Sequence, residues 1–184
     1  MRRFSRPAFL LALLFLVAAA APAAARTPNQ AHFHDAFLRM DAQWPNIGSH
    51  DYWLALRDAE DLLKRLTPEE IAVDPQVQRD ARAIDVYRKC WLALHVKEKA
   101  LSEFLVGQLL LQSTPDNTQD AREHFALAAA SLDEAFRLWP FLTRETVRGD
   151  VLGPRGDVQK GGLVATGAVW RSLVQRHLDA VSPK

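Results

Sequence analysis

The longest regular pattern of apolar and polar residues in the chain runs from Asp74 to about Ser113. After Pro75, neither a proline nor a long polar stretch interrupts it. Apolar residues recur at spacings of three, four or their sum in two adjacent stripes, one of Val77, Ala81, Ile84, Tyr87, Trp91, Leu94, Leu101 and Leu105 and one of Val86, Cys90, Ala93, Ala100, Phe104 and Leu111. Two stripes need neighbours on two sides, so the pattern predicts a long central helix, with Asp74 as its N-cap.

Amphipathic patterns predict four further helices, over residues 29–43, 50–66, 118–138 and 158–181. Trp44 and Trp139 each precede a proline, which disfavours helical geometry, so helices are expected to end there. Thr67 and Glu70 fit a capping box at the start of a short helical turn. Because no useful stretch alternates between apolar and polar residues, the sequence predicts an all-α, single-domain bundle of about five helices.

The first 25 residues follow the layout of a secretory signal peptide. Three arginines precede an apolar run from Ala8 to Ala21, and small residues end at Ala25, so cleavage is expected before Arg26. The run is too short for a stable membrane span. Residues 26–184, the helical domain, then carry 20 basic and 22 acidic residues, a net charge of −2. The sequence predicts a periplasmic or secreted protein without an overall charge that attracts nucleic acid.

Six of the eight glycines lie between Gly149 and Gly167, and they predict a glycine-rich loop at residues 143–157. Two copies of Arg-Gly-Asp-Val begin within this segment, one at residues 148–151 and one at residues 155–158. Gly153-Pro154-Arg155-Gly156 suits a type I turn, and Asp157 is expected to cap the last helix. Gly161, Gly162 and Gly167 are therefore expected inside that helix or at its start, where their bare backbone allows close approach of another helix or a ligand.

The candidate binding residues gather around this loop. They are Trp139, Arg144, Arg148, Arg155, Lys160, Gly161 and Gly162. The spacing is not that of a phosphate-binding loop, and Glu145, Asp150 and Asp157 offset most of the positive charge. The segment therefore indicates either a recognition loop for a partner or a pair of turns with no binding role.

Other residue types that carry chemistry are few and scattered. His32 and His34 suggest a metal site, but residues two apart on a helix do not share a face, so a solvated helix start is favoured. Cys90, the only cysteine, lies within an apolar stripe and is expected in the core. No motif of a metalloenzyme, haem protein or serine hydrolase occurs, so neither catalytic residues nor a cofactor or metal site are predicted.

These observations favour a non-enzymatic helical protein that binds an envelope protein or a small ligand, as an accessory subunit or scaffold. The alternative is an enzyme or ligand carrier with a pocket between helices near Trp139, Arg144 and Arg148. A third hypothesis is homo-oligomerisation through the apolar width of the central helix.

Overall fold

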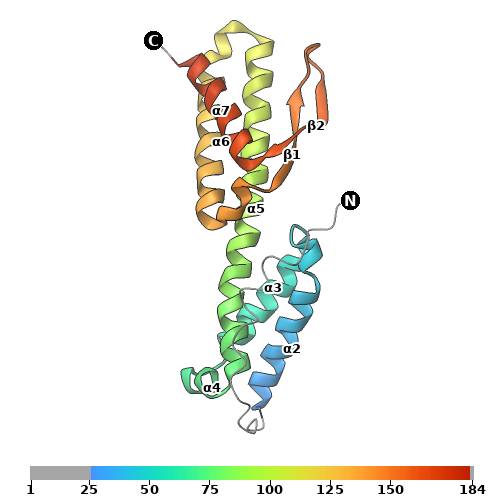
Figure 1. Ribbon diagram of the computed structural model, residues 1–184, viewed down its shortest axis with the longest axis vertical. Helices are drawn as coiled ribbons and strands as arrows, with labels where there is room; N and C mark the ends of the chain where they lie inside the picture. The colour runs from blue at the N-terminus through green and yellow to red at the C-terminus, as the bar shows by residue number, and fades with distance from the viewer. Residues whose placement is uncertain (1–25, 183–184) are drawn as a thin grey trace. The chain divides into compact units, whose positions relative to one another are not determined.

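The computed structural model describes residues 26–182, so the predicted signal peptide lies outside the described residues. Helices α2 (Pro28–Ala42), α3 (His50–Leu63), α4 (Pro68–Val73) and α5 (Pro75–Ser113) are followed by α6 (Thr118–Leu138) and α7 (Gly167–Val181) (Figure 1). Between α6 and α7 lie two strands, β1 (Thr146–Leu152) and β2 (Val158–Thr166). The predicted mostly helical fold with one long helix is confirmed, and the strands are an addition to it. Among residues 26–182, no helix is long and apolar enough to cross a membrane.

Local side-chain chemistry sets where the helices begin. The Asp74 carboxylate accepts hydrogen bonds from the backbone N–H groups of Gln76 and Val77 at the start of α5, as the sequence predicted. Thr67 and Glu70 form the predicted capping box of α4. Two hydrogen bonds lower the pKa of the Glu70 carboxyl below its ordinary range. The larger effect comes from the Thr67 backbone N–H and the smaller from the Thr27 hydroxyl, both of which donate to this carboxylate.

Contacts between residues divide the chain into two compact units, one ending at Arg88 and the other beginning at Lys89. Helix α5 therefore contributes residues to both units. In the first unit, α2 and α3 pack against each other, and the start of α5 contributes Val77 and Ile84 to the buried residues. The other large buried apolar residues of this unit are Phe33, Phe37, Met40, Ile47, Tyr52, Leu56 and Leu66.

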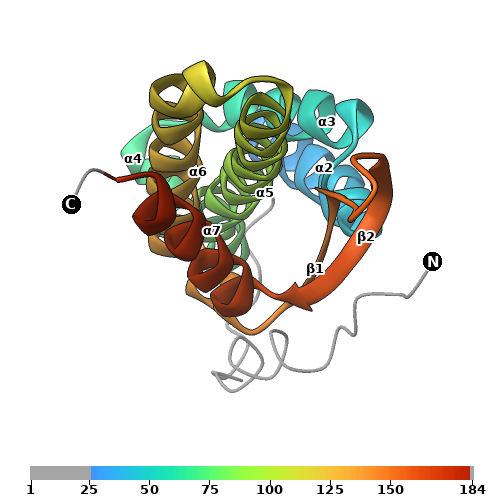
Figure 2. The same ribbon diagram turned by 90° about the horizontal axis from the view of Figure 1, so that it is seen from above.

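The second unit is built from the C-terminal part of α5, the helices α6 and α7, and the two strands. Its main core consists of Ala100, Leu101, Phe104, Ala121, Phe125, Ala128, Ala129, Leu132, Val147, Trp170 and Val174. Within this unit, α6 and the strands lie on opposite sides of α5 (Figures 1 and 2). The close approach of Phe125 to Gly107 on the α6 side, and of the strands to Gln108 and Gln112, agrees with this arrangement.

The predicted loop at residues 143–157 is wrong. Strands β1 and β2 form an antiparallel hairpin, in which Thr146 is opposite Thr166 and Leu152 is opposite Val158. The last helix begins at Gly167, where the Thr166 side chain caps it, so Asp157 is not its cap and residues 158–166 are not helical.

The residues of the hairpin alternate between inward and outward positions, as strand residues do, although the sequence does not show this alternation. Val147 and Gly149 are buried, and Val151, Leu163 and Ala165 pack against the main core of the second unit, whereas Arg148 and Val164 are exposed. A Cβ at position 149 would lie 2.7 Å from Cζ2 of the buried Trp170 ring, so only glycine fits there. The inward position thus carries no apolar side chain, and the alternation of a strand is not visible in the sequence.

Candidate functional site

The hairpin contains both copies of the Arg-Gly-Asp-Val sequence, and the first copy lies in β1 at a bulge. Gly149 is opposite Leu163 and Val151 is opposite Gln159, so one residue of β1 is opposite three residues of β2. Gly161 lies at the middle of this bulge with a φ of 57°, in the left-handed region that favours glycine. The bulge therefore leaves the Gly161 peptide groups without partners in the β1 backbone.

Side chains of the first copy replace those missing partners. The Asp150 carboxylate accepts a hydrogen bond from the Gly161 N–H at 2.6 Å, and the Arg148 Nε donates to the Gly161 carbonyl at 3.2 Å. A buried N–H without a partner costs about 1–3 kcal/mol, so this pairing stabilises the bulge. Arg148 and Asp150 are thus engaged within the hairpin, and their role is structural.

The second copy lies at the turn of the hairpin. The Gly156 N–H donates to the Gly153 carbonyl at 2.9 Å, the four-residue spacing that the sequence predicted for a β-turn. The Gly153 N–H in turn donates to the carbonyl of Asp157 at 2.8 Å. Only backbone groups hold this turn, and the side chains of Arg155 and Asp157 are exposed. Neither makes a hydrogen bond or ion pair with another residue in the described part of the chain.

The structure separates the predicted site residues into three groups. Arg148 and Gly161 are brought together, as described above, whereas Arg144, Arg155 and Lys160 are exposed and their side chains have no ion-pair partner among residues 26–182. Gly161 and Gly162 both lie in β2, at the bulge, and Gly162 is exposed. The expectation that they lie in a helix is therefore wrong.

Trp139 forms the third group, away from the bulge. It follows the last residue of α6, as predicted, and packs with a separate cluster of Ala93, Ala135 and Leu142. Its indole Nε1 is buried and has no hydrogen-bond partner among the described residues. No contact joins Trp139 to Arg148 or Gly161 among the hydrogen bonds and core clusters of the described residues.

Besides the packing of its inward residues, the hairpin contacts helices of the second unit at three positions along its length. Near its base, the Trp170 Nε1 donates to the Val147 carbonyl at 3.1 Å. Further along, the Leu152 N–H donates to Oε1 of Gln108 at 3.1 Å, and at the tip Gly156 lies against the side chain of Gln112. The sequence offers no signal for the two glutamines, because each contacts a residue more than 40 positions away.

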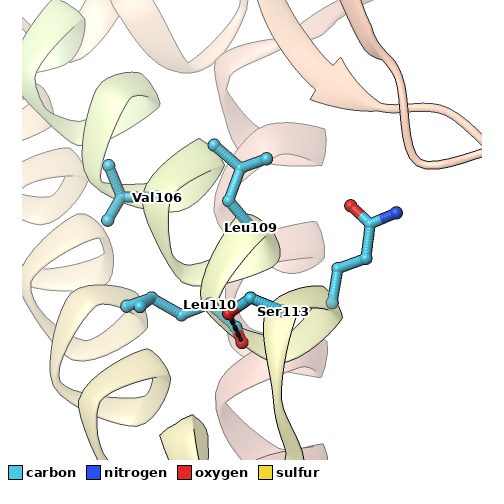
Figure 3. Close-up of a pocket in the computed structure, with 5 residues that line it drawn as sticks. Val106, Leu109, Leu110 and Ser113 are labelled. Atoms are coloured by element: carbon cyan, nitrogen blue, oxygen red, sulfur yellow. Dashed lines mark hydrogen bonds between the residues drawn. The ribbon is translucent and has the colours of Figure 1, made fainter.

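An open groove lies beside these glutamines on α5, with a volume of about 520 Å³. Val106, Leu109, Leu110 and Ser113 line it from successive turns of the helix, together with Gln112 (Figure 3). No residue of the predicted set lines this groove. It lacks the converging polar groups that orient substrates in enzymes, so its geometry does not support a catalytic pocket.

Two further reactive side chains are held within the fold, Cys90 by burial and His34 by a hydrogen bond. Burial raises the pKa of the Cys90 thiol to about 12, which disfavours the nucleophilic thiolate. His34 bonds through Nδ1 to the buried Asp80 carboxylate at 2.6 Å, and Gln76 donates to the other Asp80 oxygen. Within the part of the chain that the structure describes, no three histidine, cysteine or acidic residues gather as a metal site requires.

Comparisons with protein-family models, with curated proteins and with solved structures each found no match to this chain.

Proposed function

We propose that the chain is an exported, non-enzymatic binding or accessory protein, and that the outer face and tip of the β1–β2 hairpin are its recognition surface. The observation that carries this proposal is the combination of exposed apolar side chains and unpartnered cations on one rigid element. Val164 is 57% exposed and Val158 is 42% exposed. The exposed side chains of Arg155 and Lys160 lie on the same hairpin.

The hairpin is suited to bind a partner because its inward side chains pack on the core and its outward side chains are exposed to solvent. Val147, Val151, Leu163 and Ala165 pack on the core, so the exposed side chains are presented from a supported backbone. An exposed valine is ordinary on its own, but apolar groups beside free cations provide both contact area and directional bonds. The partner that fits is a protein surface with carboxylates beside apolar side chains.

Export is part of the same proposal and rests on the pattern of the first 25 residues. It is tested by fractionating cells that make the tagged chain and sequencing the N-terminus of the product. A mature protein that begins at Arg26 in the envelope fraction supports export. A cytoplasmic product that retains Met1 contradicts it.

The binding surface is tested with a photo-crosslinking amino acid at Val164, introduced into the chain in its own cells. We expect a discrete crosslinked partner that disappears when Arg155→Glu and Lys160→Glu are combined. The matched control combines Arg82→Glu with Lys99→Glu, two exposed cations of α5 without ion pairs among the described residues. Loss of the crosslink in both double variants, or no crosslink at all, argues against the hairpin as the recognition surface.

A further inference from the structure

Three histidines of the described chain bond to other elements, and their partners differ in chemistry. His34 and His124 each face a carboxylate at 2.6 Å, that of Asp80 and that of Glu103. His177, on α7, instead faces the side-chain amide of Gln108 on α5, with 3.5 Å between the two Nε2 atoms. Protonation strengthens a histidine–carboxylate pair, whereas its effect on a histidine–amide pair depends on which atom donates.

The hydrogen bonds around His177 determine its tautomer. Its Nδ1 lies 3.0 Å from the Leu173 carbonyl, which can only accept, so Nδ1 carries the proton of the neutral ring. The Nε2 atom is then an acceptor and receives a hydrogen bond from the amide nitrogen of Gln108. The other end of that amide, Oε1, accepts from the Leu152 N–H of β1.

In this chain of hydrogen bonds, each residue donates to the next. The Leu152 N–H donates to Gln108, the Gln108 amide nitrogen donates to His177, and His177 donates to the Leu173 carbonyl. A second proton on His177 turns Nε2 into a donor that faces the donor nitrogen of Gln108. Rotating the amide by 180° satisfies the imidazolium but places the amide nitrogen against the Leu152 N–H. Either way, one hydrogen bond between the hairpin, α5 and α7 is lost.

Within residues 26–182, no carboxylate forms a hydrogen bond or ion pair with the His177 ring. The ring lies against Phe104 of α5 and Phe125 of α6, with ring centres at 4.9 Å and 5.4 Å. Acidic groups on the surrounding elements are engaged elsewhere: Glu103 with His124, Asp150 with Gly161, Asp133 with Arg171, and Asp179 with Gln175. Its neighbour in sequence, Arg176, is exposed and has the same sign of charge.

We propose that His177 and Gln108 form a proton-sensitive latch that holds the outer half of the hairpin against α5 and releases it on acidification. The latched state binds one proton fewer than the released state, so its population rises with pH. Histidine is the side chain that most readily gains a proton near neutral pH, so pH is the variable that tests the latch. The base of the hairpin stays attached, because the Trp170 Nε1–Val147 bond contains no titrating group.

Native-state hydrogen exchange at the Leu152 amide, corrected for the intrinsic pH dependence, tests this inference in the purified protein. If the Gln108 amide rotates to satisfy the imidazolium, the Leu152 N–H loses its acceptor, so between pH 7.5 and pH 5.5 we expect protection at Leu152 to fall about fivefold, which corresponds to the loss of that hydrogen bond. The Trp170 indole N–H and the Ala129 amide in the α6 core should keep their protection. Parallel loss at all three positions indicates acid unfolding and overturns the latch.

Two variants test the direction of the effect. His177→Gln retains an acceptor for the Gln108 amide but does not titrate, so protection at Leu152 should become independent of pH. Gln108→Glu places a carboxylate between Leu152 and His177, so acidification should increase protection at Leu152 instead. An unchanged pH response in either folded variant overturns the inference.

The effect of the latch on partner binding rests on the proposed function of the hairpin. The exchange measurement does not, since it is made without a partner. A missing crosslink therefore contradicts the proposed function alone, and an unresponsive Leu152 amide contradicts the latch alone.

Discussion

The two Arg-Gly-Asp-Val copies have the same four residues but different structural surroundings. In the first copy, Gly149 lies under Trp170, and the side chains of Arg148 and Asp150 bond to the peptide groups of Gly161. In the second copy, Gly156 lies at the turn with a φ of 80°, and the neighbouring charged side chains have no partners in the described chain. Identical short sequences thus serve as an internal brace in one place and as a free surface in the other, because the elements packed around them differ.

The largest expected losses of stability lie at the glycines of the two copies. Gly149→Ala places a Cβ against the buried Trp170 ring, which cannot move aside, and should lower the free energy of unfolding by about 1–3 kcal/mol. Gly156→Ala should lower the free energy of unfolding by about 1–2 kcal/mol, because the backbone at this position is left-handed. The nearby Gln112 side chain is flexible and can move away from the new Cβ, so it should add little to this cost.

Urea unfolding followed by circular dichroism measures both values. Gly48→Ala is the matched control, because a Cβ there meets no atom within 4 Å. Equal stability losses at positions 48 and 149 would show that Trp170 does not constrain the first copy.

Smaller losses of stability are expected at the aspartates. Asp150→Ala removes the acceptor for the Gly161 N–H and should cost about 1–2 kcal/mol of unfolding free energy. Asp157→Ala removes an exposed carboxylate that has no side-chain partner in the described chain, and should change stability by less than about 0.5 kcal/mol.

Asp150→Asn retains a side-chain carbonyl that can accept the Gly161 bond, so it should recover most of the loss seen with alanine. Thermal unfolding of the three variants checks the order. A mild Asp150→Ala variant would mean that the bulge does not depend on this carboxylate.

The smallest losses of stability are expected at the arginines, and only one of the two is expected to affect binding. Arg148→Ala loses one exposed bond to the Gly161 carbonyl, about 0.5–1 kcal/mol. Arg155→Ala should leave stability unchanged and weaken the crosslink from Val164. Measuring melting temperature and crosslink yield for both variants separates the two roles, and a reversed pattern would contradict the assignment of a brace and a free surface.

Thiol labelling compares the accessibility of the two copies without altering the core. At pH 8 the raised pKa of Cys90 leaves about one thiol in ten thousand as thiolate, so the native chain should not react with iodoacetamide until it unfolds. In this background, Asp157→Cys should react quickly and Asp150→Cys more slowly. Mass spectrometry of timed samples gives the rates, and rapid labelling of Cys90 in folded protein would contradict its burial.

The sequence by itself determined most of the helices and several of their ends. The apolar spacing of α5, the caps at Thr67 and Asp74, and the end of α6 before Trp139-Pro140 all depend on residues within a few positions of one another. Such interactions are local, so the amino-acid pattern contains the information needed to predict them.

Only the tertiary structure decided the hairpin and its attachments. An inward-facing strand position that carries glycine looks like a loop in sequence, and it becomes part of a strand because Trp170 fills the space above it. The left-handed Gly161 and its bonds to Arg148 and Asp150 depend on a register that the chain acquires when β1 and β2 pair. Gln108 joins Leu152 to His177 across 44 and 69 positions, and a contact over such distances arises from packing, for which one sequence carries no local signal.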